Sequence, residues 1–158
     1  MSAIGYSNHK ILGRMFHVPW HPKLTELLIW LTFGLSTDHG KKLIITSSWR
    51  PQKIHDNDSG IHCTSPLRAF DLRSHIQSNG HYESIFGKSP EDIENMVNTC
   101  WQYDPDRPRL NVCVFHDTGL GHHYHFQVHP NTLLVKSFSC ESFVVGEYFD
   151  DEGRSDTG

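Results

Sequence analysis

Two histidines and one aspartate, in three separate segments, have side chains that together suit a single metal ion. His62 follows a polar, turn-rich segment, Asp71 ends an apolar run, and His125 closes the triplet His123-Tyr124-His125. Three protein ligands of this kind, with a fourth position left to water, are typical of a catalytic zinc ion and not of a structural one. The residues therefore make a zinc hydrolase, with Zn²⁺ as its cofactor, the first hypothesis.

Strand alternation predicts which side chains face this ion, because successive residues of a strand point to opposite faces. One face of the segment that follows the hairpin loop is polar and holds His123, His125, Gln127 and His129. The other face is apolar and suits a core: Tyr124, Phe126 and Val128. If the strand that carries Ala69 and Asp71 lies beside it, Asp71 can reach an ion held by His125.

Each of these residues also has a plain structural interpretation. The chain contains 13 histidines, and a single histidine is more often a surface or hydrogen-bonded residue than a metal ligand. A buried Asp71 could equally pair with Arg68 or Arg73. The combination of a loop–strand unit bearing His and Asp with a His-x-His face opposite an apolar stripe favours the metal site.

The composition is that of an ordinary folded protein. The chain has 158 residues, of which 37% are hydrophobic and 20% charged, and this predicts a single domain over residues 1–149. Residues 150–158 form an acidic tail that we expect to be disordered. The net charge of −4 comes from the acidic end. Because no stripe of Lys and Arg occurs, no nucleic-acid partner is expected, and we expect a monomer.

The four cysteines show no paired spacing of a metal-binding or redox motif: Cys63, Cys100, Cys113 and Cys140. A core of this size needs no disulfides, and no secretory signal is seen, so reduced thiols are expected. No stretch reaches the roughly 18 apolar residues of a membrane span. These features together predict synthesis in the cytoplasm, without a signal peptide.

Periodicity predicts the elements that carry the candidate site. Leucines at three- and four-residue steps predict a helix over 23–35, and Ser89 before Pro90 predicts the start of a second helix over 90–103. Short apolar segments predict strands at 42–47, 67–73, 110–115 and 123–128, the last two joined by a hairpin loop at 117–121.

The remaining segments are predicted as connections. Residues 1–20 are expected to form a loop or arm packed by Phe16 and Trp20, and residues 49–65 a loop that delivers His62 to the sheet. The order of the elements predicts an α+β fold with a small, mostly antiparallel sheet flanked by helices.

These segments resemble the motifs of the zinc D-alanyl-D-alanine and L-alanyl-D-glutamate peptidases, which share the hedgehog/D,D-peptidase fold. That family has a strand ending in the letters SGYR, a motif of the form S-x-H-x-x-G-x-A-x-D, and a later His-x-His element. The matching residues are Thr46-Ser47-Ser48-Trp49-Arg50, then Ser59-Gly60-Ile61-His62 with Arg68-Ala69-Phe70-Asp71, then His123-Tyr124-His125. The resemblance runs from about Leu43 to Val128, and the size of the chain is similar to that of phage cell-wall peptidases.

The resemblance implies a zinc metallopeptidase that hydrolyses an amide bond in peptidoglycan stem or cross-bridge peptides, as an endolysin or a carboxypeptidase, and that acts on the cell wall after release. It implies that His62, Asp71 and His125 bind the zinc ion. It also implies that Arg50 faces the developing oxyanion or the substrate carboxylate, and Ser48 is expected to contact the substrate beside it.

Two departures from the family's pattern bear on catalysis. The loop 63–66 makes the spacing from His62 to Asp71 two residues longer, which a loop absorbs without moving the ligands. Many members place a Glu or Asp general base three residues before the last ligand, where this chain has His122. We therefore expect His123 to handle the proton, Asp117 to orient His123 through a hydrogen bond, and His122 to be secondary.

Other interpretations stay open at this point. Arg50 could form a salt bridge with Asp56 or Asp58 and have no part in catalysis. The chain could be a non-catalytic zinc-binding module of the same fold. A cupin-like metal oxygenase is a further alternative, because His129 follows the His-x-His pair, although the two predicted helices do not suit a cupin.

Overall fold

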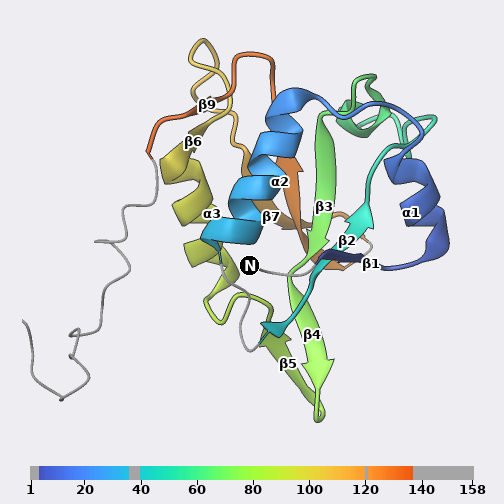
Figure 1. Ribbon diagram of the computed structural model, residues 1–158, viewed down its shortest axis with the longest axis vertical. Coiled ribbons are helices and arrows are strands. Elements are labelled where there is room, and N and C mark those ends of the chain that lie inside the picture. Colours follow the sequence, from blue (N-terminus) through green and yellow to red (C-terminus); the bar gives the residue numbers. More distant parts are fainter. Residues whose placement is uncertain (1–3, 36–39, 120, 137–158) are drawn as a thin grey trace, which may run out of the picture.

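A small five-stranded sheet lies at the centre of the molecule (Figure 1). The computed structural model describes residues 4–35, 40–119 and 121–136. The elements, in chain order, are β1 (Ile4–Tyr6), α1 (His9–Met15), α2 (Pro22–Gly34), β2 (Leu43–Ser47), the 3₁₀ turn η2 (Ile61–Cys63), β3 (Ala69–Arg73), β4 (His75–Ser78), β5 (His81–Ser84), α3 (Pro90–Cys100), β6 (Trp101–Gln102), β7 (Cys113–Asp117), β8 (His122–Gln127) and β9 (Leu133–Leu134).

The central sheet has the strand order β1-β2-β3-β8-β7, and only β1 and β2 run parallel. Two further pairs, β4–β5 and β6–β9, form small antiparallel sheets of their own. The expected α+β fold with a small, mostly antiparallel sheet flanked by helices is therefore confirmed. The helices predicted over 23–35 and from Ser89 onward are present as α2 and α3, which does not suit a cupin.

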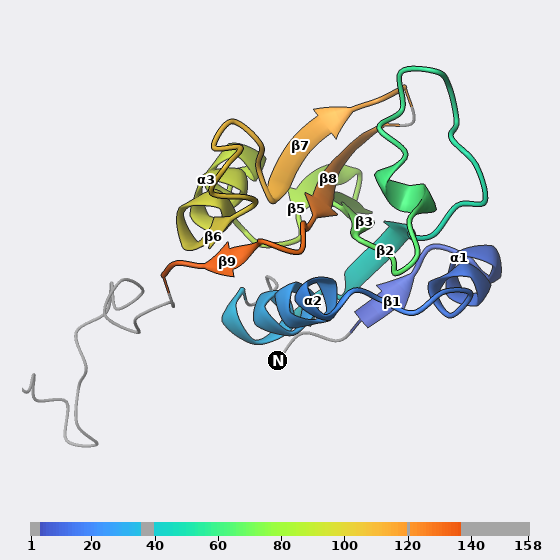
Figure 2. The ribbon, with the colours of Figure 1, turned by 90° about the horizontal axis from the view of Figure 1, so that it is seen from above.

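The two long helices begin where the sequence provides caps. Pro22 occupies the first turn of α2, and the Ser89 hydroxyl accepts a hydrogen bond from the Asp92 amide at 3.1 Å at the start of α3. A serine cap satisfies one of the amides that a helix start leaves without an intrahelical partner. Figure 2 shows α2 on one side of the sheet and the long loop between β2 and β3 on the other.

The core lies between the sheet and the helices. The sheet residues with no exposed surface in this core are Leu43, Ile45, Phe70, Leu72, Cys113, Tyr124 and Phe126, and α2 contributes Leu24, Leu27 and Leu31. The Phe70 ring stacks between Trp20 and Phe126, with centroids 5.7 and 5.3 Å away. Full burial of each such side chain stabilises the fold by roughly 1.5–3 kcal/mol. Alternation then leaves the opposite face of β3 and β8 to polar side chains.

Residues 1–20 are not the loop that was expected, because the described part of this segment forms β1 and α1. The Asn8 side chain caps α1 by accepting from the Ile11 amide at 3.0 Å. Phe16 is 78% exposed and does not belong to the core cluster, whereas the Trp20 indole donates to the Met15 carbonyl at 2.7 Å and packs against the core. The prediction therefore holds for Trp20 and is wrong for Phe16.

The hairpin β4–β5 was not predicted, although the sequence contains its turn. Asn79 and Gly80 both have positive φ angles, +50° and +79°, and Asn-Gly is the preferred pair for a tight hairpin turn. The hairpin extends away from the central sheet (Figure 1). The acidic tail predicted at 150–158 lies outside the described residues. Within the described part of the chain, no helix combines the length and the apolar character needed to cross a bilayer.

Candidate metal centre

Three segments bring the side chains of His62, Asp71 and His125 together. Asp71 on β3 is the register partner of His125 on β8. His62 lies in η2, after Gly60, whose φ of +75° favours glycine. The Arg50 amide donates to the His62 carbonyl at 2.9 Å and closes the loop. One nitrogen or oxygen atom from each of the three side chains lies within 4.8 Å of the others.

The spacing of these three atoms suits a tetrahedral zinc ion. Bonds of about 2.0–2.1 Å at tetrahedral angles separate two ligand atoms by about 3.3 Å. The Nε2 atom of His62 is 3.3 Å from Nδ1 of His125 and 3.3 Å from Oδ1 of Asp71. The third separation, between Asp71 Oδ1 and His125 Nδ1, is 2.8 Å, about half an ångström short of that value. The residues present therefore fit the ion.

The ring nitrogen of His62 that does not face Asp71 and His125 is hydrogen-bonded to the backbone. Nδ1 of His62 lies 2.8 Å from the carbonyl oxygen of Ser48, and a carbonyl only accepts, so Nδ1 carries the proton. In a neutral ring, Nε2 then has a lone pair, and this lone pair faces the cluster. The side chain is only 3% exposed, so the cluster is the partner available to Nε2.

Gln127 fixes His125 in the same way. The Gln127 amide nitrogen donates to the Asn111 carbonyl at 2.8 Å, which leaves Oε1 facing Nε2 of His125 at 3.3 Å. Nε2 therefore donates, and Nδ1 of the neutral ring has the lone pair. Two imidazole lone pairs and one carboxylate oxygen thus converge on one point, an arrangement that calls for a proton or a metal ion between them.

The environment keeps Asp71 ionised. Burial by itself raises the pKa of Asp71, but the hydrogen bonds and charge that the His125 and His62 rings supply when they are protonated outweigh burial and hold the pKa well below its usual range. An ionised carboxylate is the form that binds metal. Neither Arg68 nor Arg73 makes an ion pair with Asp71 within the described structure, so the alternative pairing considered for Asp71 does not occur.

His123 lies beside the three candidate ligands with its free nitrogen toward them. Its Nδ1–H donates to the Gly121 carbonyl at 2.9 Å. Its Nε2 is 3.8 Å from Oδ2 of Asp71, the carboxylate oxygen that the two ligand imidazoles do not share. The predicted polar face of β8 is therefore present, with Nε2 of His123 directed into the site.

His116 is a member of this cluster that the sequence interpretation missed. It is the register partner of His123 across β7 and β8, and its ring is 4.8 Å from that of His123 and 5.7 Å from that of His125. Burial, followed by the charges of His123 and His125, lowers the pKa of His116, which favours the neutral ring. Counting alternation back from the hairpin would have placed His116 on this face.

Asp117 does not make the expected hydrogen bond to His123. Its Oδ1 instead accepts from the backbone amides of Gly119 at 2.8 Å and Gly121 at 3.1 Å, and these bonds lower its pKa. An aspartate often caps a tight turn in this way, because its short side chain reaches the amides that follow it. Asp117 is thus a turn residue, and its Oδ2 lies 3.8 Å from Nδ1 of His122.

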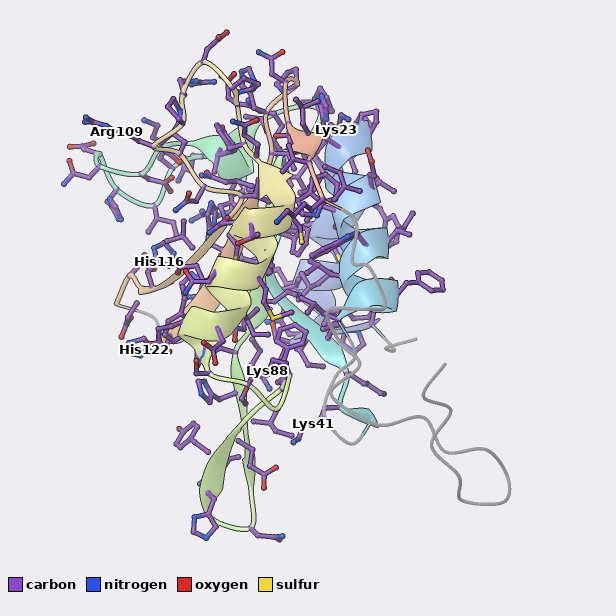
Figure 3. All side chains as sticks on the ribbon, turned by 90° about the vertical axis from the view of Figure 1, so that its left-hand side faces the viewer. Lys23, Lys41, Lys88, Arg109, His116 and His122 are labelled. Atoms are coloured by element: carbon purple, nitrogen blue, oxygen red, sulfur yellow. The ribbon has the colours of Figure 1, made fainter. Side chains whose placement is uncertain are left out.

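His122 points away from the three candidate ligands, as alternation predicted. Its ring stacks on Phe115 with centroids 5.3 Å apart, and its side chain is 62% exposed. Figure 3 shows His116 and His122 at the same edge of the molecule, where β7 and β8 meet. His129, predicted to share the polar face of β8, lies beyond the end of the strand and near Asp104, 3.6 Å from its Oδ2.

Arg50 lines the site but is also held by the loop. Its Nη1 is 3.4 Å from Oδ2 of Asp58, so the salt bridge considered from the sequence exists, with Asp58 and not with Asp56. The Nε atom of Arg50 is buried and has no hydrogen-bond partner among the described residues. The pairing with Asp58 therefore positions the guanidinium without using all its donors.

Ser48 does not contact the substrate side of the site. Its side chain is buried, at 1% exposure for the residue, and its hydroxyl lies 3.5 Å from the Ile11 carbonyl. This burial does not favour the expected contact with a substrate. The backbone carbonyl of Ser48 instead orients His62. The type of side chain at position 48 does not predict this hydrogen bond.

The cluster opens into a hollow of about 520 Å³ between the β2–β3 loop and the turn that joins β7 to β8. Its lining includes the three candidate ligands together with Arg50, Arg73, His116 and His123. A concave site with converging polar groups is the usual form of a small-ligand or active site. No protein-family model matches the chain, and no curated protein or solved structure matches it either.

Proposed function

We propose that this chain is a zinc-dependent hydrolase of an amide bond in peptidoglycan stem or cross-bridge peptides. One observation supports the metal dependence of the proposed reaction. Nδ1 of His62 is hydrogen-bonded to the Ser48 carbonyl and Nε2 of His125 to the Gln127 side chain, so the lone pair on the other nitrogen of each ring faces Asp71. Outer hydrogen bonds of this kind are typical of metal-binding imidazoles. The resemblance of the motifs to the zinc peptidases of cell walls supports the peptide substrate.

In this proposal His62, Asp71 and His125 hold the zinc ion. A zinc ion bound there supplies polarisation of the scissile carbonyl and lowers the pKa of water toward about 7. Asp71 contributes the charge that makes the site selective for a cation, and the two neutral imidazoles are suitable ligands beside it.

In this proposal His123 is the general base, and Arg50 supplies the positive charge that stabilises the oxyanion. The lone pair on Nε2 of His123 takes a proton and passes it to the leaving amine, because Nδ1 is fixed by the Gly121 carbonyl. Arg50 directs its remaining donors at the negative charge that develops on the carbonyl oxygen. Asp58, the other carboxylate that lines the pocket beside these ligands, is bonded to two backbone amides and to Arg50, so we take an imidazole as the base.

The proposal is tested by digesting purified peptidoglycan with the protein and identifying the new termini by mass spectrometry. We expect a single type of amide cleavage that a chelator abolishes and added zinc restores. His62→Ala and His125→Ala should lose both the metal and the activity, because two remaining ligands cannot fix a tetrahedral site. His81→Ala, an exposed histidine on the hairpin β4–β5, is the matched control and should retain both.

His123→Ala separates the base from the ligands. It should keep one zinc ion per chain and lose turnover by about 10²- to 10⁴-fold, the usual contribution of a general base. Near-parental turnover in His123→Ala would assign the proton transfer to another group, and His116→Ala is then the next variant, because His116 is the neighbouring imidazole.

A non-catalytic zinc-binding module is the second candidate. The observation that favours it is His122 at the position of the usual acidic base, with its ring stacked on Phe115 and away from the ligands. Stoichiometric zinc binding without new termini in any peptidoglycan digest would support this candidate and overturn hydrolysis.

A further inference from the structure

A second hollow adjoins the metal pocket at the end of the sheet. It has a volume of about 650 Å³ and lies between the hairpin β4–β5, the start of α3 and the beginning of β8. Arg73, Gly121 and His122 line both this hollow and the metal pocket. A peptide chain that leaves the metal pocket over these three residues would enter the second hollow.

Arg73 stands at the junction of the two hollows with its charge unused. It is the last residue of β3, two positions after Asp71, and alternation places both on the same face of the strand. Its side chain is exposed, and it makes no hydrogen bond or ion pair with any described residue. Arg50, by contrast, is held by Asp58 at 3.4 Å.

The surroundings of Arg73 favour an anion. Across β3 and β8, Arg73 is the register partner of His123, so its backbone lies next to that of the proposed base. Of the residues described around the second hollow, Arg73 is the permanently charged cation, and Glu91 is the carboxylate. No ion pair joins them within the described structure. A guanidinium with its planar donors free is suited to bidentate binding of a carboxylate.

We propose that Arg73 is a specificity residue that binds a free carboxylate of the substrate next to the scissile amide, and that the substrate chain continues into the second hollow. The inference rests on the proposed function and names its substrate class: acidic peptides that extend on both sides of the cleaved bond. Removal of a single terminal residue would not need the second hollow.

Two stem peptides that differ in one group test this inference. One contains glutamate with its free carboxylate, and the other contains the corresponding carboxamide. For the parent, kcat/KM should be about 10- to 100-fold higher on the carboxylate peptide, the range expected of a hydrogen-bonded charge pair. Arg73→Gln should reduce hydrolysis of the carboxylate peptide by that factor and leave hydrolysis of the carboxamide peptide within about twofold.

The control variant is Arg109→Gln, which removes an exposed arginine that lines neither hollow. Figure 3 shows Arg109 far from His122 on this side of the molecule. Arg109→Gln should preserve the preference for the carboxylate peptide. Zinc content and circular dichroism of Arg73→Gln establish that the variant is folded and loaded.

A binding measurement separates failure of this inference from failure of the proposed function. If neither peptide is cleaved, calorimetric titration of parent and Arg73→Gln with both peptides gives a readout without turnover. Carboxylate-dependent binding that Arg73→Gln loses would support the subsite and overturn hydrolysis. Where the peptides are cleaved, an equal loss of hydrolysis of both peptides in Arg73→Gln, or no loss for either, would overturn the subsite and leave the proposed hydrolysis intact.

Discussion

At the scale of single residues, Gln127 decides which nitrogen of His125 is available to a metal ion. Its amide is oriented by the Asn111 carbonyl, and its Oε1 accepts from Nε2 of His125. The ring is therefore held in the tautomer whose Nδ1 faces Asp71, at 2.8 Å from Oδ1. Such outer hydrogen bonds set the orientation and basicity of a metal-binding imidazole.

Replacing Gln127 should weaken zinc binding without removing a ligand. We expect Gln127→Ala to lower zinc affinity by about 10- to 100-fold, the usual effect of losing an outer hydrogen bond to a ligand. Competition with a chromophoric chelator measures the affinity, and His81→Ala is the control. An unchanged affinity in Gln127→Ala would mean that the tautomer of His125 is held by other means.

Arg50 gives a second prediction at this scale. If Arg50 stabilises charge that develops only in the transition state, Arg50→Lys should lower kcat by about 10²-fold or more at unchanged zinc content, because lysine lacks the planar donors. Steady-state kinetics and metal analysis of the same preparation measure both quantities. Unchanged turnover would leave Arg50 with its structural role alone, the ion pair with Asp58.

At the scale of elements, the loop between β2 and β3 is organised around one carboxylate. Oδ1 of Asp58 accepts from the Gly60 amide at 2.8 Å, and Oδ2 accepts from the Ile54 amide at 3.1 Å and pairs with Arg50. Burial alone would raise the pKa of Asp58, but the two amides and Arg50 outweigh burial and hold the pKa below its ordinary value. The ionised form of Asp58 therefore stabilises the loop.

The sign of the pH dependence follows from this lowered pKa. The stabilisation is fully present above the ordinary aspartate pKa of about 3.9 and is lost as the pH falls through the lower value in the folded state. We expect protection of the Ile54 and Gly60 amides from hydrogen exchange to fall below about pH 4. Zinc-free protein must be used, because acid also releases the metal by protonating its ligands.

Asp58→Asn is the comparison for this experiment. An asparagine does not ionise in this range, so its loop should have lower protection that stays nearly constant with pH. A parental pH profile in Asp58→Asn would show that another group controls the loop.

The sequence was informative about these elements to different degrees. The triad of ligands was predictable, because alternation on β8 and the loop–strand unit around His62 and Asp71 depend on local pattern. His116 was missed, because the strand was predicted to end at residue 115, whereas β7 continues to Asp117 and pairs His116 with His123. The hydrogen bonds of the Asp117 side chain to the turn and of the Ser48 carbonyl to His62 were not predicted, because residue types alone do not show how a turn or a backbone carbonyl is bonded.

At the scale of the whole molecule, the proposed ion joins the β2–β3 loop to the paired strands β3 and β8 of the central sheet. His62 lies in the β2–β3 loop, Asp71 on β3, and His125 on β8, 63 residues after His62. A metal that binds the folded state and not the unfolded chain stabilises the fold by mass action. Zinc should therefore act on global stability as well as on activity.

Variants on the two faces of β8 should separate the stabilisation by zinc from the stabilisation by core packing. We expect zinc at about a hundredfold excess over its Kd to raise the free energy of unfolding of the parent by about 2.7 kcal/mol. His125→Ala should lose this increase, and its zinc-free stability should also fall somewhat, because the buried Asp71 loses a hydrogen-bond partner. Phe126→Leu, one residue away in the core with no exposed surface, should lower zinc-free stability by about 1–3 kcal/mol and keep the full increase with zinc. Denaturant unfolding followed by circular dichroism, with and without zinc, measures all three proteins. An equal response to zinc in His125→Ala and the parent would exclude His125 as a ligand.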